Sequence, residues 1–195
     1  MTFEQLHEII RDNNNYMQAA TGEDREDDAY VAIFCIPGNQ FEGAIEGMTL
    51  YVKSERKNCT ALYATHDWDT YRIEDLVPYG TTFANVFYFK PQDLLTYLPE
   101  ILRDRKIICY DKKDSAVPLR EMLASHGDRF ELTSEVVDVK EEAREVLGVI
   151  PDYQLDTILA VCGYNPEDFA EDALGTVMKI RNIYESLRAI KNANV

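Results

Sequence analysis

Apolar positions along the chain alternate between continuous runs and runs with helical spacing. Three continuous runs follow one another from residue 30: residues 30–36 (YVAIFCI), 47–52 (GMTLYV) and 59–65 (CTALYAT). Such runs, rich in β-branched and aromatic residues, are typical of strands buried in a sheet. Because the segments between them are short, the three strands are predicted to form an antiparallel meander.

Beyond the meander, the pattern predicts another buried strand and several helices. The strand is residues 106–110 (KIICY), whereas residues 85–89 (NVFYF) fit either a fourth strand or an extended approach to the next helix. Helices are predicted over residues 2–11, 94–102, 114–126, 152–162 and 165–187, and the second of these is interrupted at Pro99. A further helix is predicted to follow an extended stretch at residues 131–138 and to end at residue 147.

This succession of elements predicts a mixed α/β fold. The 195 residues suit one compact domain, and no internal repeat is present. Residues 1–29 are expected to form an N-terminal helix and an acidic loop, in which residues 23–28 (EDREDD) hold five acids. Residues 30–195 are expected to form the main body of the domain.

The net charge of the chain determines which classes of partner are expected. The formal net charge is −15, and the lysines and arginines are scattered along the chain. This charge disfavours nucleic acid unless folding assembles a basic groove, and it favours a protein partner with a basic surface. No apolar run reaches membrane-spanning length and the N-terminus does not resemble a signal peptide, so we expect a cytoplasmic protein without a membrane partner. The spacing of the four cysteines is not that of a zinc site, which predicts free thiols.

The last predicted helix contains the candidate acid Asp172. Asn165 can cap this helix and Pro166 fits its first turn, while Asp172 lies beside the apolar stripe. The carboxylate is either a solvated or capping group, or part of a site with partners elsewhere in the chain. Gly-rich phosphate loops, GxSxG turns and HExxH motifs are missing from the sequence, and the three histidines lie far apart.

Two acidic motifs come after the three strands of the predicted meander: CYDKKD at residues 109–114 and EDFAEDALGT at residues 167–176. They resemble the HNxxFD and HxAxxDAxxT motifs of the DEDD superfamily (DnaQ-like) three-prime to five-prime exonucleases, with Asp114, Asp172 and Thr176 matching. The resemblance spans about residues 30–187. It implies a ribonuclease H-like fold: a mixed sheet with an antiparallel three-strand meander, followed by a parallel strand and flanking helices. It also implies that Asp114 and Asp172 are catalytic acids that bind metal.

The sequence differs from the exonuclease motifs at positions where the family has metal ligands and a general base. The family's first strand carries Asp-x-Glu, and this chain has Cys35-Ile36-Pro37 there. The histidine or tyrosine that serves the family as general base is replaced by Glu167 or Asp168. A two-metal site needs oxygen ligands to compensate the charge of both ions. The nearest acids that could replace the missing ligands are Glu42 and Glu46.

These departures predict a degenerate, inactive exonuclease-like domain, a pseudoenzyme that binds or regulates a protein or a nucleic-acid complex. In this interpretation Asp114 and Asp172 are remnants of the metal site. One alternative is an active Mg²⁺- or Mn²⁺-dependent exonuclease with a rearranged ligand set that also draws on Asp111, Glu167 or Asp168. Another is an acidic inhibitor that mimics nucleic acid.

Overall fold

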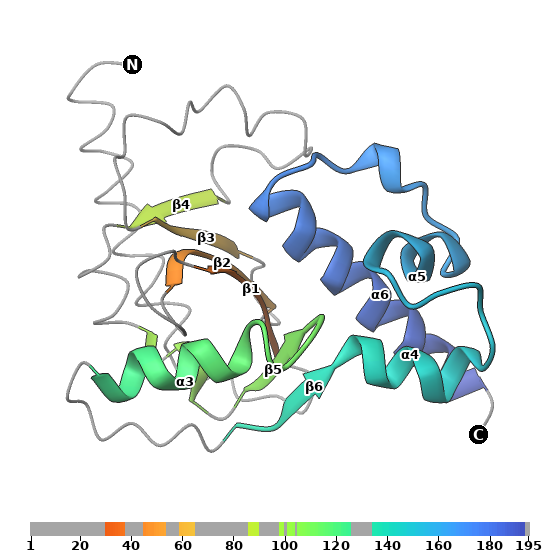
Figure 1. Cartoon of the computed structure of the whole chain (residues 1–195), viewed down its shortest axis with the longest axis horizontal. Coiled ribbons are helices and arrows are strands. Elements are labelled where there is room, and N and C mark those ends of the chain that lie inside the picture. Colours follow the sequence, from red (N-terminus) through yellow and green to blue (C-terminus); the bar gives the residue numbers. More distant parts are fainter. Residues whose placement is uncertain are drawn as a thin grey trace.

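The fold is known from a computed structural model that describes residues 30–37, 45–53, 59–64, 86–89, 98–99, 101–103, 105–125 and 134–193. The expected N-terminal helix and acidic loop (residues 1–29), Glu42 and the histidines lie outside these residues, and so does the side chain of Glu46. In the described part, strands and helices form a mixed α/β structure (Figure 1).

Six strands in the described residues form one mixed sheet with the order β4-β3-β2-β1-β5-β6. β1 pairs antiparallel with β2, and β2 with β3, as the meander prediction requires. β5 lies parallel to β1, β6 parallel to β5, and β4 parallel to β3. Residues 85–89, for which the sequence fitted either a strand or an extended approach to a helix, therefore contain a strand. The strands are β1 (Tyr30–Pro37), β2 (Ile45–Lys53), β3 (Cys59–Ala64), β4 (Val86–Phe89), β5 (Lys106–Cys109) and β6 (Val136–Asp138).

The described helices follow the predicted order. Their bounds are α3 (Ala116–Ser125), α4 (Val139–Leu147), α5 (Leu155–Val161), the 3-10 turn η3 (Pro166–Asp168) and α6 (Ala173–Ala193). α4 ends before Gly148, whose φ of 65° suits a residue without a side chain.

The predicted start of the last helix is wrong. Asn165 does cap a helix with Pro166 in its first turn, but that helix is the single turn η3, which ends in extended backbone at Phe169. α6 begins only at Ala173, where the carboxylate of Asp172 accepts the N–H of Gly175. The segment therefore contains two capping residues: Asn165 caps η3, and Asp172 caps the long helix α6.

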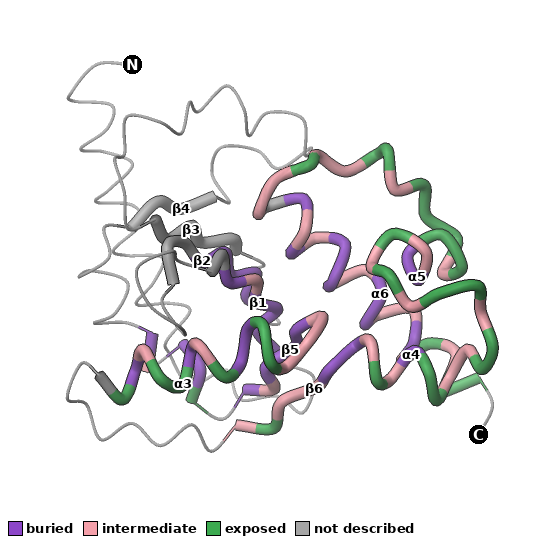
Figure 2. The backbone as a smooth tube through the Cα atoms, in the orientation of Figure 1, coloured by how far each residue is buried: buried purple, intermediate pink, exposed green. Residues whose placement is uncertain are grey.

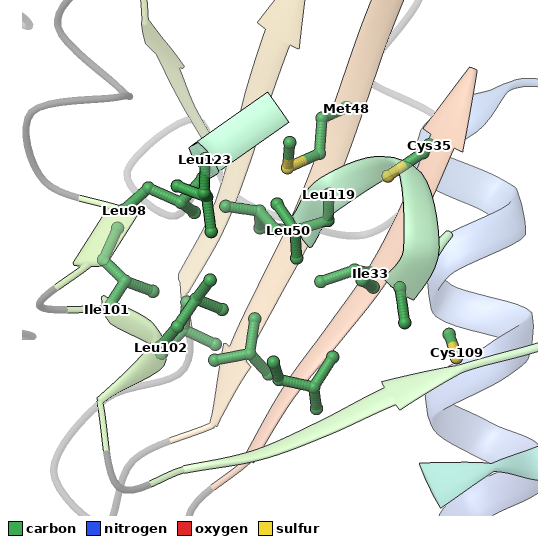
Figure 3. Packing of buried hydrophobic residues seen from close by; sticks show 14 residues of the cluster. Ile33, Cys35, Met48, Leu50, Leu98, Ile101, Leu102, Cys109, Leu119 and Leu123 are labelled. Atoms are coloured by element: carbon green, nitrogen blue, oxygen red, sulfur yellow. The ribbon is translucent and has the colours of Figure 1, made fainter. Parts of the chain in front are cut away.

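β1 lies inside the sheet, between β2 and β5, and most of its residues from Tyr30 to Cys35 are buried (Figure 2). Both of its faces are apolar, and they belong to two different core clusters. Val31, Ile33 and Cys35 pack with α3 and with Leu98, Ile101 and Leu102 (Figure 3). Tyr30 and Ala32 pack on the opposite face against α4, α5 and α6. The alternation of side chains along a strand thus gives a sheet covered on both sides.

None of the helices in the described part of the chain combines the length and the apolar character needed to cross a membrane.

Candidate nuclease-like site

Cys35 occupies the first-strand position where the family resemblance calls for an aspartate. Its side chain is 2% exposed, and its Sγ donates a hydrogen bond to the carbonyl oxygen of Ser115 at 3.5 Å. Burial raises the pKa of this thiol to about 12, and the nearby thiol of Cys109 acts in the same direction. The group is therefore a neutral thiol at physiological pH. Figure 3 shows Cys35 and Cys109 among the buried residues of this cluster.

The pairing of β1 also becomes irregular at Pro37, the position where the resemblance calls for a glutamate. The pairing of β1 with β2 shifts register between Ile36 and Pro37. Proline has no N–H to donate to the ladder, which explains why regular pairing is interrupted at its position. Neither position thus carries the carboxylate that the resemblance calls for: one holds a buried thiol and the other a proline at an irregularity of the strand pairing.

Asp114 lies in the turn between β5 and α3, next to the residue that Cys35 contacts. Its side chain is exposed, and its N–H donates to the carbonyl of Asp111 at 3.2 Å. The hydrogen bond from Cys35 to Ser115 brings the end of β1 beside this turn. Two of the motif positions, separated by almost 80 residues in sequence, are therefore neighbours in the fold.

Asp172 has a structural function at the start of α6. Its Oδ1 accepts the N–H of Gly175 at 2.7 Å, and its carbonyl accepts the hydroxyl of Thr176 at 2.8 Å. The motif residues Asp172 and Thr176 are thus joined to each other within one helical turn. This capping accounts for both residues without a metal ion, and the metal-binding role of Asp172 stays a prediction.

The acids considered as substitutes for the missing base are exposed and lie in η3. The N–H of Glu167 donates to the side-chain oxygen of Asn165 at 3.3 Å, and the Asn165 amide donates to Asp168 at 3.4 Å. Both acids belong to the first turn after a cap, where negative charge offsets the partial positive charge of unpaired N–H groups.

Asp111 is the most strongly constrained carboxylate of the turn before α3. It accepts the N–H of Lys113 at 3.0 Å and the ammonium group of Lys140 at 3.3 Å. Partial burial acts to raise its pKa, but these two hydrogen bonds outweigh it and the pKa lies below the ordinary value. The carboxylate is therefore ionised and already paired with a cation.

Asp138, the last residue of β6, is the most buried of these acids. It is 7% exposed and accepts three main-chain N–H groups, from Lys112, Lys140 and Glu141, at 3.0 to 3.1 Å. These bonds cap α4 and fasten the turn after β5 to it. The sequence does contain a signal, because Asp138 is followed three residues later by Glu141 as in a capping box.

The described residues do not fit the two-metal site implied by the resemblance. Magnesium and manganese prefer oxygen ligands, and the first-strand position holds a neutral thiol that donates to a carbonyl. Among the described residues, no three histidine, cysteine, aspartate or glutamate side chains are grouped so that they could hold a metal ion. Asp114 and Asp172 are the described acids that stand at motif positions, and the carboxylate of Asp172 already caps α6.

No family model matches the sequence, and no curated protein matches it. The likeness to the exonuclease superfamily therefore rests on the motifs and the topology of this chain alone.

Proposed function

We propose that this chain is an exonuclease-like domain that lacks nuclease activity and acts by binding a protein with a basic surface. The strand order supports the ribonuclease H-like part of the proposal. Three antiparallel strands, β3, β2 and β1, are followed across the sheet by β5 and β6, which run parallel to β1. This is the arrangement that the resemblance implies, with β4 as an addition at the edge beside β3.

The observation that carries the loss of activity is the bond from Cys35 to Ser115. Phosphodiester hydrolysis by two metal ions requires carboxylates that hold the ions close together and compensate their charge. At the central strand this chain has a thiol whose pKa is about 12, buried in an apolar cluster. A neutral sulfur that donates its proton to a carbonyl supplies neither negative charge nor an oxygen ligand for Mg²⁺.

The charge of the chain supports the proposed kind of partner. The formal net charge is −15. The segment of residues 152–172 contains six acids and no lysine or arginine, and five of these acids are exposed. Such a surface attracts a cationic partner and repels a phosphate backbone.

Calorimetric titration with Mn²⁺ tests the loss of the metal site. We expect no saturable binding at millimolar metal in the wild type, and the same result for a variant with Asp114→Asn and Asp172→Asn. Saturable binding that the double variant loses would overturn the proposal and favour the active exonuclease with rearranged ligands.

Binding to a lysine-rich peptide tests the partner class separately. Fluorescence anisotropy should show binding at low ionic strength that weakens as salt is added, because the interaction is electrostatic. Substitution of Glu167, Asp168 and Glu171 by lysine should weaken it more than three lysine substitutions at Glu121, Glu141 and Glu145, which are also exposed. Preferential binding to single-stranded DNA or RNA instead would contradict the basic-protein partner.

A further inference from the structure

We draw no further inference here: the strongest candidate, the acidic surface of residues 152–172 with the exposed side chains of Val161 and Tyr164, carries none because nothing in the structure shows what covers it.

Discussion

The thiol of Cys35 on β1 donates a hydrogen bond to the main-chain carbonyl of Ser115, which immediately precedes α3, at a distance of 3.5 Å. This bond fastens the centre of the sheet to the turn that contains Asp114. It also means that the side chain at the first motif position is committed to packing and to a backbone acceptor.

The buried thiol of Cys35 should make stability depend on pH in the alkaline range. Its pKa is about 12 in the folded chain and 9.0 in the absence of burial. Below pH 9 the thiol keeps its proton in both the folded and the unfolded chain. Between pH 9 and about pH 12 the thiol loses its proton in the unfolded chain and keeps it in the folded chain. The free energy of unfolding should therefore fall with rising pH, by about 1.4 kcal/mol per pH unit from this thiol.

Urea unfolding between pH 8 and 11, compared for the wild type and Cys35→Ala, measures this contribution. The variant is expected to be less stable at pH 8 but to lose stability less steeply as the pH rises. Identical slopes for the two proteins would show that Cys35 is not a buried thiol. Cys109, whose pKa is also raised to about 12 by burial, should keep its own share of the slope in the variant.

Gly175 in the first turn of α6 should not tolerate a side chain. A Cβ at this position would lie 2.0 Å from the carbonyl oxygen of Ala170, which is main chain and cannot rotate away. Helix propensity alone predicts that Gly175→Ala stabilises the helix by about 1 kcal/mol. We expect the opposite sign, a loss of about 1 to 3 kcal/mol, because the overlap forces the backbone to shift.

The matched control for Gly175→Ala is Asn192→Ala, an exposed position in the last turn of the same helix. It should change the free energy of unfolding in urea by no more than about 0.5 kcal/mol. If Gly175→Ala proves as stable as the wild type, the close approach of residue 170 to the helix is not present in solution.

Lys179 on α6 is only 8% exposed, and its ammonium group lies 2.6 Å from the carboxylate of Asp156 on α5. Asp156→Ala should cost about 1 to 2 kcal/mol, less than a fully buried pair because the Asp156 side chain is 59% exposed and water can partly replace it. The loss has a physical cause, since the substitution leaves a buried ammonium group without its anion.

A double-mutant cycle with Lys179→Met separates this effect from packing. Asp156→Ala should cost clearly less in the Lys179→Met background, where no charge remains to be compensated. Equal costs in both backgrounds, measured as free energies of unfolding, would mean that the pair does not hold α5 against α6.

Asp138 should be the acid whose loss destabilises the described fold most. Asp138→Ala removes the acceptor for three main-chain N–H groups and should cost about 2 kcal/mol or more. Asp152→Ala is the control, because Asp152 is exposed and its side chain accepts the main-chain N–H of Gln154. Thermal or urea unfolding that ranks the two variants equally would contradict the buried capping role.

Much of the sheet could be predicted from sequence because its strands are continuous apolar runs. β1 and β5 are buried on both faces, and such strands are recognised by composition without knowledge of their neighbours. The start of α6 could not be predicted in the same way. Asn165 and Asp172 are both good caps, and local sequence does not show that the chain becomes extended at Phe169 between them.

The site was predictable only in part, for a similar reason. The motif resemblance selected Asp114, and the missing match to Asp-x-Glu selected Cys35, but their proximity depends on contacts between residues about 80 positions apart. The role of Asp138 was missed because an aspartate at a strand end is common, and its three hydrogen bonds come from two separate segments. Long-range packing decides such roles, and a single sequence contains little information about it.

A nuclease assay tests the proposal that the domain lacks metal-dependent nuclease activity. End-labelled single-stranded DNA and RNA are incubated with Mg²⁺ or Mn²⁺ and either the wild type or the Asp114→Asn, Asp172→Asn double variant. Asparagine is as good a helix cap as aspartate, so the variant should remain folded. We predict the same background degradation for both proteins. Stepwise shortening from the three-prime end by the wild type, abolished in the double variant, would show that the domain is an active exonuclease.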